Sequence, residues 1–264
     1  MKRKSYIVCF IYLFFISLGF EFELAALSNG DLSNKEYILF GNGVAILLLY
    51  IIPLLLVLRW CYSEYNLKKH QLALAIFSGF FISGWSAALA NQWLGNLWKS
   101  FLDKDTFSLW ETAMTAPFTE EFLKLLAAVF VLFFLKTWKP RQAFLIGAGV
   151  GLGFQISEDI SYVLHSVIET PTMAVSDVFL RISGSLTSHW LMTALVTASF
   201  CLLLCHQRQK KWGAIGIFAT ILFHFLWNSP LTSFDIPLSL HIAFLNACYL
   251  FLCYYYWKIL LVKD

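Results

Sequence analysis

The sequence contains eight apolar stretches that are each long enough to cross a lipid bilayer. A bilayer core is about 30 Å thick, and a helix needs roughly 20 apolar residues to span it. The stretches lie near 5–27, 37–58, 71–94, 108–135, 142–165, 185–205, 213–230 and 238–257. The longest connection between them, about 166–184, has room for an interfacial helix. We therefore expect an all-α, polytopic membrane helix bundle with about eight transmembrane helices.

The composition agrees with a chain that lies mostly in lipid. Of its 264 residues, 59% are apolar and 13% are charged, whereas an ordinary soluble domain carries about 25% charged residues. No linker rich in proline or glycine divides the chain, so we expect a single integral membrane domain over 1–264. The formal net charge of +3 is too small to indicate binding to nucleic acid, and the expected surroundings are the lipid bilayer.

The distribution of lysine and arginine predicts the orientation, because these residues are retained on the cytoplasmic side during insertion. With the N-terminus inside, 14 of the 19 cationic residues fall in cytoplasmic segments. Both termini are therefore predicted to be cytoplasmic. Lys2–Lys4 and the apolar run after them also resemble a signal peptide. We interpret the run as a retained helix, because the alternation of cations holds with this helix included.

Several ionisable residues lie inside the apolar stretches, where each charged side chain costs at least about 2.5–3.5 kcal/mol. The clearest are Glu120, Glu121, Lys124, Glu158 and Asp159. Such groups must be paired or hydrated, and ionisable residues within a membrane usually mark a functional site. The alternative is a buried salt bridge that fixes helix packing only. Asp159 points to a different helix face from Glu158, and we interpret it as a packing or hydrated group.

Polar residues of four successive stretches fall at one depth in the membrane. Counted at 1.5 Å per residue, positions about 11 to 16 residues from the inner helix ends lie roughly 20 Å up, in the outer half of the bilayer. The residues at this depth are Glu120, Glu121, Glu158, His189, His224 and Asn228. We expect their side chains to meet in one polar cavity.

Spacing within the helices supports this convergence. Lys124 is four residues from Glu120 and three from Glu121, so its ammonium can neutralise either carboxylate. His224 and Asn228 are one helical turn apart, so an imidazole and an amide can face the same space.

The segments that carry these residues have a recognisable order and spacing. They are Pro117–Lys124, Gly151–Tyr162, Arg181–His189 and His224–Asn228. Together they resemble the PrsW family of intramembrane proteases, a relative of the CAAX-protease and bacteriocin-processing group. The resemblance implies hydrolysis of peptide bonds in membrane-anchored protein substrates by glutamate-activated water, with a catalytic core at about 108–230. Asp159 departs from the family pattern, in which Asn is expected beside the glutamate.

The positions that match the family are six polar residues at the predicted depth. They are Glu120, Glu121, Glu158, His189, His224 and Asn228. The resemblance also implies an integral, multi-pass protein of a bacterial or archaeal cell membrane. Members of the family have been described as metalloproteases, whereas the related CAAX group is similar to metal-independent glutamic proteases.

Peptide hydrolysis needs a base to activate water, donors for the oxyanion and a proton for the departing amine. We expect Glu120 or Glu121 to be the base, with Lys124 holding it ionised. This mechanism needs no cofactor. The position of the site in the outer half of the bilayer favours cleavage near the outer membrane face.

The remaining polar residues have supporting roles in this hypothesis. His189 and Glu158 are expected to position the water. His224 and Asn228 are expected to stabilise the tetrahedral oxyanion.

Three alternatives remain open from the sequence. Glu158, His189 and His224 could bind zinc, because two histidines, a carboxylate and water form a known catalytic ligand set. A proton-coupled transporter could use acid and histidine chains as a relay, although the first half of the chain lacks the counterpart that repeated transporter halves show. The third alternative is a noncatalytic scaffold.

Overall fold

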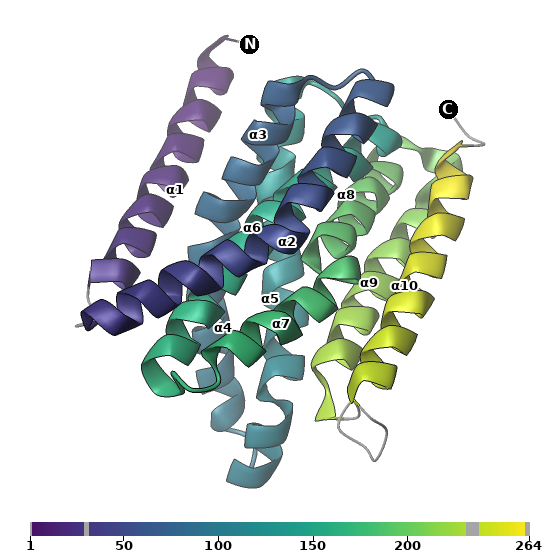
Figure 1. Ribbon diagram of the computed structural model, residues 1–264. Coiled ribbons are helices and arrows are strands. Elements are labelled where there is room, and N and C mark those ends of the chain that lie inside the picture. The colour runs from purple at the N-terminus through teal and green to yellow at the C-terminus, as the bar shows by residue number, and fades with distance from the viewer. Residues whose placement is uncertain (1, 29–31, 231–237, 262–264) are drawn as a thin grey trace.

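The computed structural model describes residues 2–28, 32–230 and 238–261, and every regular element among them is helical (Figure 1). The ten α-helices in chain order are α1 (Lys2–Ser28), α2 (Asn34–Glu64), α3 (Lys69–Ser78), α4 (Gly84–Lys99), α5 (Lys104–Leu135), α6 (Pro140–Glu169), α7 (Ala174–Gly184), α8 (His189–Cys205), α9 (Lys210–Asn228) and α10 (Leu238–Leu261). Three short elements join them, the π-helix η1 (Gly79–Ser83) and the 3₁₀ helices η2 (Ser185–Thr187) and η3 (Gln207–Gln209).

A helix occupies each of the eight ranges expected from the sequence, and α7 lies in the long connection where an interfacial helix had room. Within the described residues, five segments are long and apolar enough to cross a membrane: Tyr6–Ser28, Asn34–Glu64, Lys69–Lys99, Pro140–Glu169 and Ala174–Cys205. α5 is not among them because charged residues interrupt its apolar sequence. The count of eight crossings remains a prediction.

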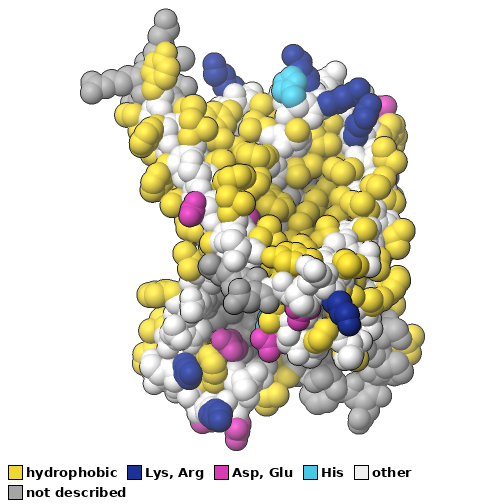
Figure 2. Space-filling view, turned by 60° about the vertical axis from the view of Figure 1, so that its left-hand side comes forward, with side chains coloured by type: hydrophobic (Ala, Val, Ile, Leu, Met, Phe, Trp, Pro, Cys, Tyr) yellow, Lys and Arg dark blue, Asp and Glu magenta, His cyan; other side chains and the backbone are white. Residues whose placement is uncertain are grey.

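The two ends of the bundle differ in charge. α1 begins and α10 ends at the same end of the molecule (Figure 1). Lys and Arg side chains gather along this end in Figure 2, above a broad band of hydrophobic side chains. The positive-inside rule predicts that this end faces the cytoplasm, and the cytoplasmic position of both termini stays a prediction. At the other end of the bundle, Asp103 is the N-cap of α5. The backbone N–H of Thr106 donates to the carboxyl of Asp103, which lowers the pKa of that carboxyl.

α6 is the central helix, and glycines bring its neighbours close. It packs against α8, α3, α2 and α5. Gly147 and Gly151 face α8, where a Cβ on Gly151 would collide with the carbonyl oxygen of His189. Gly149 and Gly153 face α3 in the same way. Small residues four positions apart let helices in lipid approach closely, so the start of α8, which carries His189, is fixed against α6.

The third apolar segment changes its helical hydrogen bonding where it meets α6. The π-helix η1 separates α3 from α4, and a Cβ on Gly79 at its start would collide with the carbonyl oxygen of Val150. Single π turns are frequent near functional sites because they re-aim the helix that follows. Here α4 follows, and it carries Asn91 to the polar cluster described below.

The close approach of α3 and α6 predicts a specific loss of stability. Gly153→Ala should lower the free energy of unfolding by about 1–3 kcal/mol, because the added methyl meets the backbone of Ile76. The matched control is Gly41→Ala, where no other atom lies within 4 Å of the new Cβ. Thermal unfolding of both purified variants in detergent measures the difference. Equal melting temperatures for the two variants would contradict this packing.

Candidate active site

Lys124 is the centre of a buried charge cluster. Its side chain is fully buried on α5. Its ammonium donates to Glu121 Oε1 at 2.7 Å and to His189 Nδ1 at 2.8 Å, and it lies 3.7 Å from Glu120 Oε2. The ammonium also lies over the ring of Phe154, 4.5 Å from its centroid. Because an unpaired charge costs several kcal/mol away from water, these partners are what makes the burial of Lys124 tolerable.

The hydrogen bonds fix the proton positions of the two histidines. An ammonium can only donate, so Nδ1 of His189 accepts from Lys124 and Nε2 carries the proton. This Nε2 lies 3.1 Å from Glu158 Oε2 and donates to it. Nδ1 of His224 lies 2.9 Å from Glu121 Oε1 and donates to that carboxylate. Nε2 of His224 is therefore the nitrogen with a free lone pair.

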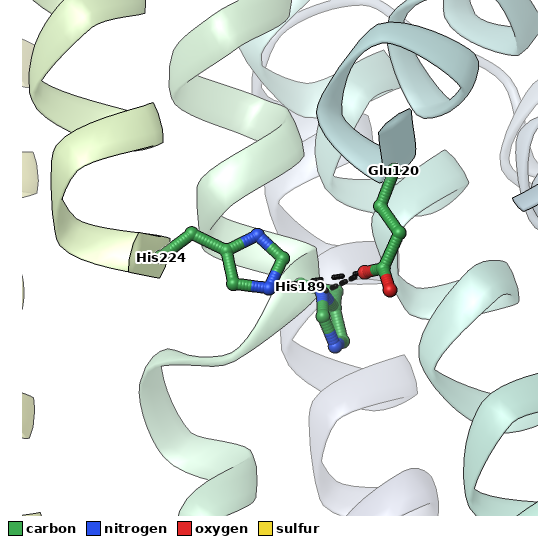
Figure 3. Close-up of side chains that lie close together, drawn as sticks. All are labelled: Glu120, His189 and His224. Carbon is green, nitrogen blue, oxygen red and sulfur yellow. Dashed lines mark ion pairs between the residues drawn. The ribbon is translucent and has the colours of Figure 1, made fainter. Parts of the chain in front are cut away.

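Glu120 has one engaged and one unengaged oxygen. Its Oε1 accepts from Nδ2 of Asn91 at 3.0 Å, and the hydroxyl of Thr119 donates to Oδ1 of the same asparagine. Its Oε2 is buried and makes no hydrogen bond within the described residues. Oε2 lies 3.8 Å from Nε2 of His224 and 3.9 Å from Nδ1 of His189 (Figure 3). At such distances one water molecule or ion can bridge the atoms.

A second charge cluster orients Glu158. Arg181 of α7 forms ion pairs with Glu158 and Asp159, and its guanidinium lies 4.2 Å from the centroid of the Tyr162 ring. The hydroxyl of Tyr50 donates to Asp159 Oδ2 at 2.6 Å. Asp159 is thus a packing residue that ties α2, α6 and α7 together, while Glu158 connects Arg181 to His189.

The two clusters border one cavity of about 560 Å³. Five of the residues expected in the site line it: Glu120, Glu158, His189, His224 and Asn228. Glu121 and Lys124 do not line it and lie behind Glu120 and the histidines. His189 opens α8 and Asn228 closes α9, so the cavity lies at the end of these helices that is remote from the basic turn His206–Gln209.

The structure changes the ligand set of the zinc alternative. Possible ligand atoms of Glu120, His189 and His224 lie within 4.8 Å of one another. The zinc ligand set expected from the sequence has Glu158 instead of Glu120. In the structure, Oε2 of Glu158 already accepts from His189 Nε2 and pairs with Arg181.

The donor set of this group fits a divalent cation such as zinc. Glu120 Oε2 is buried and makes no hydrogen bond within the described residues, and His224 has its lone pair on the nitrogen nearest to it. The bond from His224 Nδ1 to Glu121 is the carboxylate contact that usually orients a metal-bound histidine. His189 can offer Nδ1 when Lys124 gives up its hydrogen bond there.

Three residues of the cavity were not expected from the sequence. Asn91 lies in the apolar stretch 71–94. An amide within such a stretch, like a carboxylate, indicates a polar site inside the membrane. Arg181 was not among the expected site residues, although it opens one of the family-like segments. Glu23 of α1 was also not among the expected site residues, and it accepts from the hydroxyl of Ser157 at 2.8 Å at the cavity wall.

Comparison with known proteins gives one match. A family model described as PrsW family intramembrane metalloprotease matches residues 68–257, which run from the start of α3 into α10. This range holds both charge clusters except for Tyr50. No curated protein and no solved structure is similar enough to this chain to count as a match.

The buried ammonium predicts a coupled effect on stability. Lys124→Met should destabilise the protein by about 3–5 kcal/mol, because it leaves the carboxylates of Glu120 and Glu121 without their cation. The double variant Lys124→Met, Glu121→Gln should recover part of this loss, since one unpaired charge is removed with the cation. Lys99→Met, at an exposed position, is the control and should change stability by less than about 0.5 kcal/mol. Unfolding in detergent measures the stability of all three variants. If Lys124→Met were as stable as Lys99→Met, the ion pairs of Lys124 with the two glutamates would not be formed.

Proposed function

This chain belongs to the PrsW family of intramembrane metalloproteases, and we propose that it is an endopeptidase that cleaves membrane-anchored proteins near the outer face of a bacterial or archaeal cell membrane. The observation that carries the proposal is Oε2 of Glu120, which makes no hydrogen bond within the described residues and lies 3.8 Å and 3.9 Å from a nitrogen of each histidine, so that one water molecule beside them could contact all three groups. A carboxylate and an imidazole on either side of a water are what hydrolysis of an amide requires.

We assign the role of base to Glu120 rather than to Glu121. Glu121 Oε1 already accepts hydrogen bonds from Lys124 and His224, and its side chain does not line the cavity. Glu120 lines the cavity, and Asn91 holds its other oxygen. Glu120 then takes a proton from water as the water oxygen attacks the scissile carbonyl carbon. When the C–N bond breaks, the same proton passes to the leaving nitrogen, which departs as an amine.

The other cavity residues support this reaction. His224 and Asn228, one turn apart on α9, line the cavity. The side-chain N–H of Asn228 would stabilise the oxyanion of the tetrahedral intermediate, and His224 would do so once its Nε2 has taken up a proton. Glu158 fixes the ring of His189 through Nε2, and Arg181 holds Glu158 in turn. We propose Glu158 and Arg181 as positioning residues. His189 would orient the water through Nδ1 when Lys124 gives up its hydrogen bond there.

The location of the cavity restricts the substrate. A transmembrane helix keeps its carbonyl groups hydrogen-bonded, so it must unwind before a peptide bond can be attacked. The cavity lies toward the end of the bundle that the distribution of cations predicts to be outside. We therefore propose that the substrate is a membrane-anchored protein whose chain unwinds near the outer membrane boundary.

A metal-dependent reaction is the second candidate, and two observations favour it. The family is described as metalloproteases, and Glu120, His189 and His224 form a group that fits a divalent cation. When bound, zinc would polarise the scissile carbonyl and lower the pKa of a bound water. In that case Glu121 would act by orienting His224. We do not propose the proton-coupled transporter, because the family model indicates proteolysis.

The proposal predicts the effect of removing the base. Glu120→Gln should lower cleavage of a tagged single-span substrate in liposomes by at least about 100-fold, because general-base catalysis contributes about 10²–10⁴. Glu169→Gln, at an exposed position of α6, is the matched control and should cleave like the wild type. Activity of Glu120→Gln equal to the control would refute the assignment.

The same assay with a chelator separates the two candidates. Full activity in chelator, with no metal in the purified protein by mass spectrometry, supports the glutamate mechanism. Loss of activity that added zinc restores, with zinc bound to the wild type and absent from His224→Ala, shows the metal mechanism.

Asn91 should act on the rate more than on substrate binding. Asn91→Ala removes the donor to Glu120 Oε1, and the misplaced carboxylate should lower kcat by up to about 100-fold with KM nearly unchanged. The control is Asn96→Ala, an exposed position on the same helix. Steady-state cleavage kinetics measure both constants, and a rise in KM with unchanged kcat would show that Asn91 binds the substrate instead.

A further inference from the structure

A second hollow lies at the basic end of the molecule, on the opposite side of the membrane from the active-site cavity. It is a groove of about 520 Å³ between the end of α2 and the start of α3. Three cations line it, Arg59 from α2 and Lys68 and Lys69 from the beginning of α3. The proposed proteolysis uses none of these residues, so the groove is a separate feature of the molecule.

The turn that forms the groove is held in place. Asn66 adopts a left-handed conformation with φ 57°, and the N–H of Leu67 donates to the carbonyl of Tyr62 at 2.8 Å. Gln142 of α6 donates to the carbonyl of Tyr65 at 3.1 Å. These bonds fix the turn to both α2 and α6, and they set the two lysines that follow it beside Arg59.

The charge of the groove is uncompensated. Within the described residues, no ion pair joins Arg59, Lys68 or Lys69 to an acidic side chain. Glu64 is near in sequence but does not line the groove. The leading N–H groups of α3 add partial positive charge, because the first turn of a helix has no acceptors for them within the helix. The groove therefore favours an anion.

An apolar stripe leads from the lipid-facing surface of α2 into the groove. Leu49, Ile52 and Leu56 follow one another at helical spacing and are 65%, 49% and 60% exposed. Trp60, which is 64% exposed, lines the groove one turn beyond Leu56. Tryptophan is favoured at the level of lipid headgroups. The surface thus combines an anion site with an apolar track of the length of several helical turns.

We propose that this groove binds an anionic phospholipid, with the headgroup phosphate on Arg59, Lys68 and Lys69 and an acyl chain along Leu56 and Ile52. Cationic pockets between helices on the cytoplasmic side attract anionic headgroups, and each Lys or Arg near an anionic surface contributes roughly fivefold in affinity. A free phosphate would pair with the cations but would leave the apolar stripe of α2 without a partner. A phospholipid would pair its phosphate with the cations and pack its acyl chain against the stripe.

The test is a titration of the full-length protein in non-ionic detergent, followed by native mass spectrometry. Phosphatidylglycerol should bind the wild type at least about tenfold more tightly than phosphatidylcholine. The variant Arg59→Gln, Lys68→Gln, Lys69→Gln should lose this preference, and an unchanged preference would overturn the proposal. All three side chains are exposed, and circular dichroism checks that the variant is folded.

A matched variant tests whether the groove or the whole basic end attracts the lipid. Lys139→Gln, Lys210→Gln, Lys211→Gln removes the same charge from exposed positions at the same end. It should retain the preference for phosphatidylglycerol. If this variant loses as much affinity as the groove variant, the attraction is diffuse and the groove is not a site.

Two further arms separate a lipid from a free anion. Inorganic phosphate at the same concentration should not displace phosphatidylglycerol, and displacement would overturn the lipid assignment in favour of an anion site. Leu56→Asn keeps all three cations and should weaken phosphatidylglycerol binding. Unchanged binding by Leu56→Asn would contradict the position of the acyl chain.

Discussion

The arrangement of the site depends on one buried ammonium. Lys124 is fully enclosed, and it is stable only because carboxylate and imidazole groups of α5 and α8 surround it. Glu121, which it contacts, also accepts from His224 of α9. Three helices therefore have to hold a fixed depth relative to one another. Displacing any one of them would leave a charge without a partner at a depth where water cannot replace it.

The adjacent glutamates have different tasks because they lie on different faces of α5. Glu121 points toward Lys124 and His224, and its bonds set the orientation of both. Glu120 points into the cavity, where Asn91 holds one oxygen and leaves the other for a reactant. In the proposed mechanism, one of these two adjacent acids orients its neighbours and the other is the base. The glycines of α6 make this possible by fixing the start of α8, and with it His189, against the central helix.

Depth along the helices could be predicted from the sequence, but rotation about their axes could not. Counting residues from the basic ends brought Glu120, Glu158, His189 and His224 to one level, and the structure places all four at one cavity. Which carboxylate lies near both histidines depends on how each helix is turned. The sequence placed Glu158 in the zinc set, whereas the structure groups Glu120 with His189 and His224 and has Glu158 in contact with His189 only through Nε2. Arg181 was missed for a related reason. Arg181 belongs to α7, which packs against α2 and α6. The spacing of apolar residues along the sequence does not predict which helices pack together.

The charge balance of the site explains why two mechanisms compete for it. Within the two charge clusters alone, and with every acid and base ionised, the carboxylates of Glu120, Glu121, Glu158 and Asp159 contribute four negative charges, and Lys124 and Arg181 contribute two positive ones. With neutral histidines, four minus two leaves two negative charges. A membrane interior does not tolerate such an excess without compensation. A divalent cation at Glu120, His189 and His224 would balance it in one step. Two protons elsewhere in the two clusters would do the same and would leave Glu120 ionised, as a base that takes a proton from water must be. The glutamate and metal mechanisms are thus two ways of neutralising one cluster.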